Sequence, residues 1–169
     1  MARQNFYLTA ALFLAVAMTA VVGTALGFEH IGGFIPCKLC LEQREPYYAA
    51  IPVALIAAAA AAFRWPAIIA RLALGVVGLA MTYGFYLAVF HSGVEWGWWP
   101  GPTDCGAAAT SGLVTEAEGL LGALDTVTPP SCDEAAGRFL GLSFAGWNVL
   151  ASAVIAAGAY YAALRKPAA

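Results

Sequence analysis

Four stretches without charged residues decide the fold, and the first of them is 6-FYLTAALFLAVAMTAVVGTALGF-28. The other three lie at 46–63, 72–94 and 139–164. Because an α-helix rises about 1.5 Å per residue, roughly 20 apolar residues are enough to cross the hydrocarbon core of a bilayer. The sequence therefore predicts an all-α fold, in which a polytopic membrane protein forms a bundle of four transmembrane helices.

The composition excludes several classes of protein. Hydrophobic residues make up 62% of the chain and charged residues 11%, and the mean hydropathy is +0.76. A soluble domain carries about 25% charged residues, and a disordered chain is far less apolar. The net charge of −2 argues against a nucleic-acid partner, which requires a basic surface. The expected surroundings are therefore those of a lipid bilayer.

We predict one membrane domain over residues 1–169, with spans near 6–28, 46–63, 67–90 and 143–164 and outer loops near 29–45 and 91–142. The first stretch is interpreted as a span rather than a cleaved signal peptide. Its apolar part is longer than the roughly 15 residues of such a peptide, and no clear A-x-A cleavage site precedes Glu29.

The orientation follows from the charged residues between the spans. One side of the membrane carries basic residues and no acidic ones, namely Arg3, Arg64, Arg71, Arg165 and Lys166. The positive-inside rule then places both termini in the cytoplasm. In the second outer loop, apolar residues at helical spacing predict a short amphipathic helix on the membrane surface: Leu113, Val114, Ala117, Leu120, Leu121 and Leu124.

All four cysteines fall in the outer loops, with Cys37 and Cys40 in the first and Cys105 and Cys132 in the second. The outer compartment is oxidising, so two such pairs can form and exchange disulfides. We predict that the second membrane helix begins near Cys40. Helix N–H groups, and Arg44 four residues further on, would then stabilise a Cys40 thiolate. The residues alone leave open a zinc site of four thiolates, two structural disulfides, or a chance C-x-x-C.

The segment 37-CKLCLEQR-44, lying between the first and second spans, resembles the disulfide bond formation protein B (DsbB) family. The similarity continues through 91-HSGVEWGWWP-100, Cys105, Cys132 and 139-FLGLSFAGWN-148, so it covers nearly the whole chain. It implies a quinone-dependent protein-disulfide oxidoreductase of the bacterial inner membrane, with its cysteine loops in the periplasm. The implied partner is a periplasmic thioredoxin-fold protein of the DsbA type, and the implied electron acceptor is ubiquinone or menaquinone.

The resemblance also implies roles for the cysteines. The Cys105–Cys132 disulfide oxidises the partner through a mixed disulfide at Cys105. Cys132 then attacks Cys37, which leaves Cys40 facing the quinone. Arg44 is the implied quinone-binding residue, where its charge would stabilise negative charge on the acceptor. No metal is expected.

His91 ends the third span at the same interface. An imidazole titrates in the range needed to handle a quinone proton, and the resemblance places a histidine nearby. A quinone headgroup would fit where Cys40, Arg44, Tyr47 and Tyr48 begin the second helix. Three other functions stay open: a specialised paralogue with a dedicated partner, an enzyme of the vitamin K epoxide reductase type, and a non-catalytic membrane protein with structural disulfides.

Overall fold

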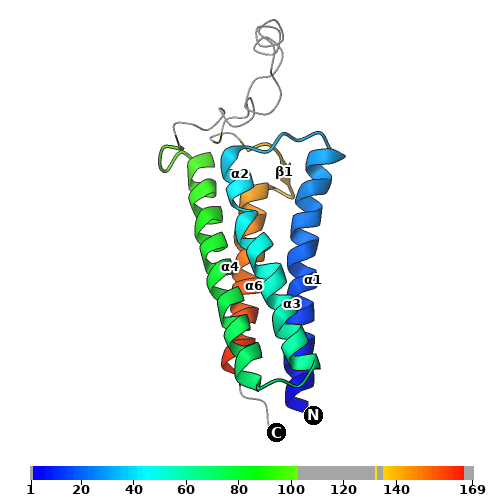
Figure 1. The fold of residues 1–169 in the computed structure, drawn as a ribbon. Coiled ribbons are helices and arrows are strands. Elements are labelled where there is room, and N and C mark those ends of the chain that lie inside the picture. Colours follow the sequence, from blue (N-terminus) through cyan, green and yellow to red (C-terminus); the bar gives the residue numbers. More distant parts are fainter. Residues whose placement is uncertain (1, 103–131, 133–134, 166–169) are drawn as a thin grey trace, which may run out of the picture.

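The computed structural model describes residues 2–102, 132 and 135–165, which form a bundle of four long helices (Figure 1). These are α1 (Ala2–His30), α3 (Glu45–Ala62), α4 (Ala67–Glu95) and α6 (Phe144–Leu164). A short helix α2 (Lys38–Glu42) precedes α3, and a hairpin of β1 (Arg138–Phe139) and β2 (Leu142–Ser143) precedes α6. Within the described residues, four helical segments are long and apolar enough to cross a membrane, which confirms the predicted fold class.

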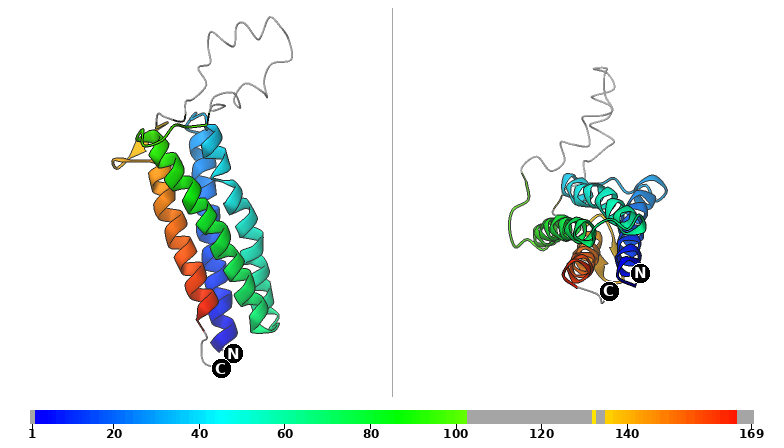
Figure 2. Two further views of the ribbon diagram at one scale, coloured as in Figure 1. Left: turned by 90° about the vertical axis from the view of Figure 1, so that its left-hand side faces the viewer. Right: turned by 60° about the horizontal axis from the view of Figure 1, so that its bottom comes forward.

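Successive long helices run in opposite directions, so both described ends of the chain lie at one end of the bundle (Figures 1 and 2). The opposite end carries α2 and the hairpin. Helix α3 packs between α1 and α4, and α6 packs mainly against α4. The amphipathic helix predicted over 113–124 lies outside the described residues.

Small side chains fill the interior of the bundle. Helix α3 buries a row of alanines: Ala50, Ala54, Ala57, Ala58, Ala60 and Ala61. Small residues let helix backbones approach closely, and such packing holds helices together in lipid, where burial of apolar surface gives no net gain. Met18, Leu74 and Met81 fill the remaining interior and are fully buried.

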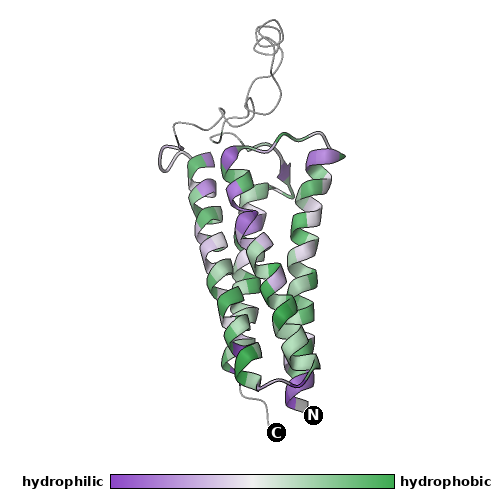
Figure 3. Cartoon of the chain, in the orientation of Figure 1, coloured by the Kyte–Doolittle hydropathy of each residue, from purple (hydrophilic) through white to green (hydrophobic). Residues whose placement is uncertain are grey.

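The outer surface of the bundle is apolar as well. Large hydrophobic side chains point outward along its length, including Phe13, Val16, Leu72 and Val154. Hydrophilic residues gather toward the two ends of the helices, and the middle is hydrophobic (Figure 3). A soluble protein does not expose so large an apolar surface, so this pattern is that of helices in contact with lipid.

Two local features differ from the sequence-based expectations. Helix α4 continues five residues beyond the predicted end at residue 90, so that His91 lies within the helix. The hairpin was not predicted. Its turn has positive φ angles at both central residues, Leu140 (51°) and Gly141 (84°), as a type I′ turn requires. Ser143, the last residue of the hairpin, caps α6 by accepting a hydrogen bond from the Gly146 N–H at 3.1 Å.

Candidate functional site

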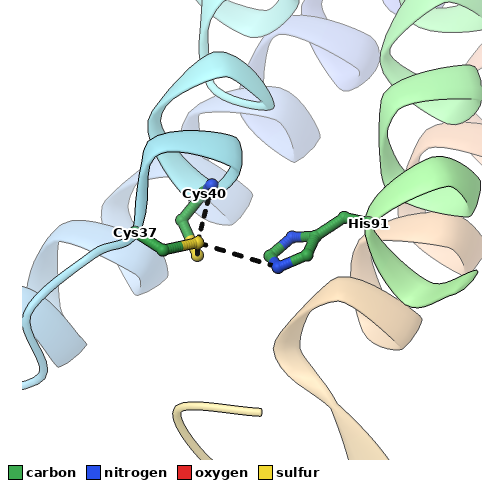
Figure 4. Close-up of side chains that lie close together, drawn as sticks. All are labelled: Cys37, Cys40 and His91. Atoms are coloured by element: carbon green, nitrogen blue, oxygen red, sulfur yellow. Dashed lines mark hydrogen bonds between the residues drawn. The ribbon is translucent and has the colours of Figure 1, made fainter. Parts of the chain in front are cut away.

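Cys37 and Cys40 lie where α2 begins, at the end of the bundle opposite the termini (Figures 1 and 4). Cys37 is the N-cap of α2, and its Sγ accepts a hydrogen bond from the Cys40 N–H at 3.2 Å. The helix thus starts at Lys38, slightly before the position predicted. The two sulfur atoms lie 2.7 Å apart, and both residues are free thiols. The pair is therefore held ready to close into a disulfide.

The two thiols of this pair are not equivalent. A hydrogen bond to the Cys40 side chain, together with burial, raises the pKa of the Cys37 thiol. Cys37 therefore keeps its proton, and its S–H can donate to the Cys40 sulfur. This arrangement favours Cys40 as the thiolate of the pair.

His91 of α4 faces the cysteine pair across the end of the bundle (Figure 4). Its Nε2 lies 3.7 Å from the Sγ of Cys37, and the imidazole is buried. The sequence placed His91 at the interface, and the structure brings it next to the thiols.

A chain of hydrogen bonds continues from the other ring nitrogen of His91. The side-chain nitrogen of Gln43 lies 2.5 Å from Nδ1 of His91. Asn148 of α6 donates to the side-chain oxygen of Gln43 at 2.5 Å, and Tyr47 of α3 donates its hydroxyl to Asn148 at 2.6 Å. Since each amide uses its oxygen as acceptor, Gln43 must donate to Nδ1. The imidazole proton then sits on Nε2, facing Cys37.

Arg44 lies at the junction of α2 and α3, where it forms an ion pair with Glu29 near the end of α1. Arg44 was expected one turn beyond Cys40 on a continuous helix. The helix is interrupted there, because α2 ends at Glu42 and α3 starts at Glu45, but Gln43 and Arg44 keep right-handed helical φ and ψ angles, so Arg44 still lies about one turn beyond Cys40. Pro46, in the first turn of α3, has no N–H to donate to a preceding carbonyl, and this favours the break.

A cavity of about 640 Å³ opens beside these residues. Its wall is mostly apolar and comes mainly from α1, α6, the segment 34–36 and the residues around the hairpin, with single residues from α2, α3 and α4. The polar side chains in the wall include Cys40, Gln43, Arg44, Tyr47, His91 and Asn148. An apolar cavity with a few polar groups is the usual form of a site for a small hydrophobic molecule. Of the two predicted tyrosines, only Tyr47 lines it.

Cys132 brings the second outer loop to the same place. It is 2% exposed and packs in one apolar cluster with Cys37, Leu39 and Val94. Cys132 is disulfide-bonded, whereas Cys37 and Cys40 are free. A zinc site of four thiolates is incompatible with that disulfide. Cys105, the predicted partner of Cys132, lies outside the described residues.

A buried carboxylate completes the surroundings of His91. Glu95 lies one turn further along α4, with its Oε1 3.8 Å from Nε2 of His91 and its side chain 4% exposed. Its Oε2 has no hydrogen-bond partner within the described part of the chain. Burial of an unpaired carboxylate oxygen raises the free energy of the folded protein. Binding of a proton or a cation at this position would therefore be favourable.

The structure gathers most of the predicted site residues at one end of the bundle: Cys37, Cys40, Arg44, His91 and Cys132. Three neighbours of these residues were missed, namely Gln43, Glu29 and Glu95. Spacing offered a signal for Glu95 alone, because it follows His91 by four residues and shares its helix face. Nothing local marks Gln43 or Glu29, since their partners come from other helices.

The chain is similar to known proteins over most of its length. The family model described as "Disulfide bond formation protein DsbB" matches residues 7–162. Disulfide bond formation protein B of Polaromonas sp. (strain JS666 / ATCC BAA-500) is 28% identical over 145 residues, which cover 85% of this chain and 82% of that protein. No solved structure matches the chain.

Proposed function

This chain belongs to the DsbB family of disulfide bond formation proteins, and on that premise we propose that it reoxidises a periplasmic thioredoxin-fold protein of the DsbA type and passes the electrons to membrane quinone. One observation carries the proposal. Cys40 lies in the wall of an apolar cavity, while its neighbour Cys37 packs against the cysteine of the other loop. The pair thus connects a disulfide to a site for a lipid-soluble acceptor.

The overall reaction transfers two electrons and two protons. The partner's dithiol is oxidised to a disulfide, and the quinone is reduced to its dihydroxy form. Two disulfides in this chain, Cys105–Cys132 and Cys37–Cys40, carry the electrons in between and are restored at the end of each cycle.

The first step is attack of a partner thiolate on the Cys105–Cys132 disulfide. Cys132 is almost fully buried, so a folded partner cannot reach its sulfur. The attack therefore falls on Cys105, which forms the mixed disulfide and releases Cys132 as the leaving thiolate. The partner's second thiol then resolves this bond and leaves as a disulfide, with Cys105 reduced.

The second step is exchange inside the protein. Cys132 is released beside Cys37, in the same apolar cluster. Its thiolate attacks Cys37 of the Cys37–Cys40 disulfide, and the new Cys37–Cys132 bond frees Cys40 as a thiolate. Cys105 then attacks Cys132, which re-forms the first disulfide and leaves Cys37 and Cys40 reduced. The described structure has this pattern, with Cys132 in a disulfide and both members of the C-x-x-C pair free.

The last step is closure of the Cys37–Cys40 disulfide, which releases two electrons and two protons. A quinone suits this cavity, because its two carbonyl oxygens can accept hydrogen bonds from the polar side chains and its ring matches the apolar wall. Ubiquinone and menaquinone both meet this description, and either would supply the two-electron acceptor. Arg44 provides a positive charge in the cavity wall to stabilise negative charge as it develops, and His91 holds a proton on Nε2 beside the sulfurs.

We also propose the orientation in a bacterial inner membrane. Both described ends of the chain lie at one end of the bundle, and α2 with Cys37 and Cys40 lies at the other (Figure 1). The basic, acid-free segments belong to the end with the termini, which the positive-inside rule assigns to the cytoplasm. The cysteines then face the periplasm, where a DsbA-type partner resides.

The proposal is tested with the purified protein in detergent, a reduced DsbA-type protein, and short-chain analogues of ubiquinone and menaquinone. We expect quinone absorbance to fall only when the reduced partner is present. Cys40→Ser should abolish the reaction. Oxidation of the partner without loss of either quinone would mean that electrons leave by another route.

A further inference from the structure

We propose that the reduced site binds one Zn²⁺ ion, or a softer divalent ion such as Cd²⁺, through Cys37, Cys40 and His91, and that the bound ion inhibits the protein. The two sulfur atoms and a ring nitrogen of His91 all lie within 4.8 Å of one another (Figure 4). Thiolate sulfur and imidazole nitrogen are the donors that Zn²⁺ prefers. The ion is an inhibitor here and has no part in the proposed electron transfer.

The distances suit a tetrahedral ion after a small adjustment. With Zn–S bonds of about 2.3 Å and Zn–N bonds of about 2.1 Å, tetrahedral ligands lie roughly 3.8 Å (S to S) and 3.6 Å (S to N) apart. The observed distance from the Cys37 sulfur to Nε2 of His91 is 3.7 Å. The two sulfurs, now 2.7 Å apart, must separate by about 1 Å, which side-chain rotation at either cysteine provides.

The charges also balance. Binding replaces two thiol protons with one divalent cation, so two thiolates and a neutral imidazole form an uncharged complex. An uncharged complex is tolerated in a buried site. The Glu95 side chain, whose Oε2 has no hydrogen-bond partner among the described residues, lies on the Nε2 side of His91 and is placed to hold a water molecule as the fourth ligand of the ion.

His91 must change its tautomer to bind the ion through Nε2, because that nitrogen now carries the proton. The hydrogen-bond chain permits this change without losing a bond. The side-chain amides of Gln43 and Asn148 must both flip. Nδ1–H of His91 then donates to Gln43, Gln43 donates to Asn148, and Asn148 donates to the hydroxyl oxygen of Tyr47. Metal-bound histidines are generally supported by such an acceptor on the second nitrogen.

Two consequences follow for the site. The ion occupies both thiolates, so the Cys37–Cys40 disulfide cannot form and electrons cannot leave. The oxidised pair has no thiolates, so the ion binds only after reduction. Binding itself does not depend on the proposed function, whereas inhibition rests on it.

Binding is tested with full-length protein carrying Cys105→Ser and Cys132→Ser, so that Cys37 and Cys40 are the only thiols. Cd²⁺ is titrated in, and the ultraviolet absorption of cadmium thiolate is followed with a competing chelator. We expect one Cd²⁺ per chain after reduction and none after oxidation of the pair. No binding, or one ion shared by two chains, would overturn the proposal.

Three variants in this background identify the ligands. His91→Gln should weaken Cd²⁺ binding at least 10-fold, whereas Gln43→Glu should strengthen it by roughly 10- to 100-fold, because a carboxylate can only accept from Nδ1. The control is His30→Gln, which changes the other histidine of the chain, an exposed residue, and should leave the affinity unchanged. Equal affinities for His91→Gln and His30→Gln would exclude His91 as a ligand.

Inhibition is tested separately on the unmodified chain. Zn²⁺ should stop quinone reduction by the reduced partner, and a chelator should restore it. If Cd²⁺ binds but Zn²⁺ does not inhibit, the inhibitory part of the proposal is wrong. If the protein reduces no quinone at all, the proposed function fails while the binding result stands.

Discussion

Gln43 and His91 are joined by a hydrogen bond of 2.5 Å between the side-chain nitrogen of Gln43 and Nδ1 of His91. Both side chains are buried, and they come from different helical segments. Because Gln43 is itself held by Asn148, its amide orientation is fixed, and so is the ring nitrogen that carries the imidazole proton. The chemistry available beside Cys37 thus depends on residues that contact neither sulfur.

Removal of the Gln43 amide should therefore affect both stability and rate. Gln43→Met keeps the length of the side chain but leaves Nδ1 of His91 and the side-chain N–H of Asn148 without the partners that Gln43 provides. We expect the free energy of unfolding to fall by about 1–3 kcal/mol, and kcat for quinone reduction to fall with little change in KM for the partner. Chemical denaturation and steady-state kinetics measure the two effects. Gln4→Met, the same change at the other end of the bundle, should leave kcat unaltered.

Because Arg44 and Glu29 form an ion pair, substitutions at these two residues should change KM for quinone in opposite directions. Arg44→Ala removes the positive charge from the cavity and should raise KM for quinone by roughly 10- to 100-fold. Glu29→Gln keeps an oxygen to accept from Arg44 but frees its charge for the acceptor, so KM should fall about two- to fivefold. Steady-state titration with quinone measures both. Glu45→Gln, at an exposed carboxylate next to Arg44, is the control. A rise in KM for Glu29→Gln would show that Glu29 is needed to position Arg44.

The burial of Cys132 predicts where the partner becomes attached. A partner lacking its second active-site cysteine cannot resolve the mixed disulfide, so the adduct accumulates. Peptide mapping of this adduct by mass spectrometry should find the partner on Cys105. Recovery mainly on Cys132 would show that the Cys132 sulfur becomes exposed during the reaction, and would reverse the assigned order of attack.

The orientation is best tested at exposed positions, because the native cysteines described here are buried or half-buried. Ile31, beyond the end of α1, and Phe63, beyond the end of α3, are 90% and 73% exposed at opposite ends of the bundle. Ile31→Cys and Phe63→Cys are made in a chain whose own cysteines are serines. A membrane-impermeant thiol reagent applied to spheroplasts should label the first variant only. Labelling of Phe63→Cys instead would invert the topology.

The spans were predictable because the signal is local. A helix in lipid needs about 20 apolar residues in a row, and the sequence contains four such runs. The end of α4 was misjudged since the polar His91 was taken to close the span, whereas its side chain is buried in a helix that continues to Glu95. The hairpin was missed because strands of two residues are too short to give an alternating pattern of apolar and polar residues.

The site was only partly predictable. The C-x-x-C pair and Arg44 form a compact motif, and His91 lies at a span end, so the sequence pointed to them directly. The hydrogen bond between Asn148 and Gln43 joins residues 105 positions apart, and Arg44 meets a carboxylate on another helix. Contacts of this kind depend on how the helices are packed, and no spacing along one chain encodes them.

The apolar cluster around Cys37 and Cys132 also has a consequence for selectivity among reductants. A small thiol in solution must cross packed side chains to reach either sulfur, since these two residues are 6% and 2% exposed. In the proposed cycle, exchange between Cys132 and Cys37 is therefore screened from small thiols in solution, whose electrons would otherwise reduce quinone without forming any disulfide in a protein. The packing that holds Cys37 and Cys132 together thus also limits reduction of these residues by small thiols.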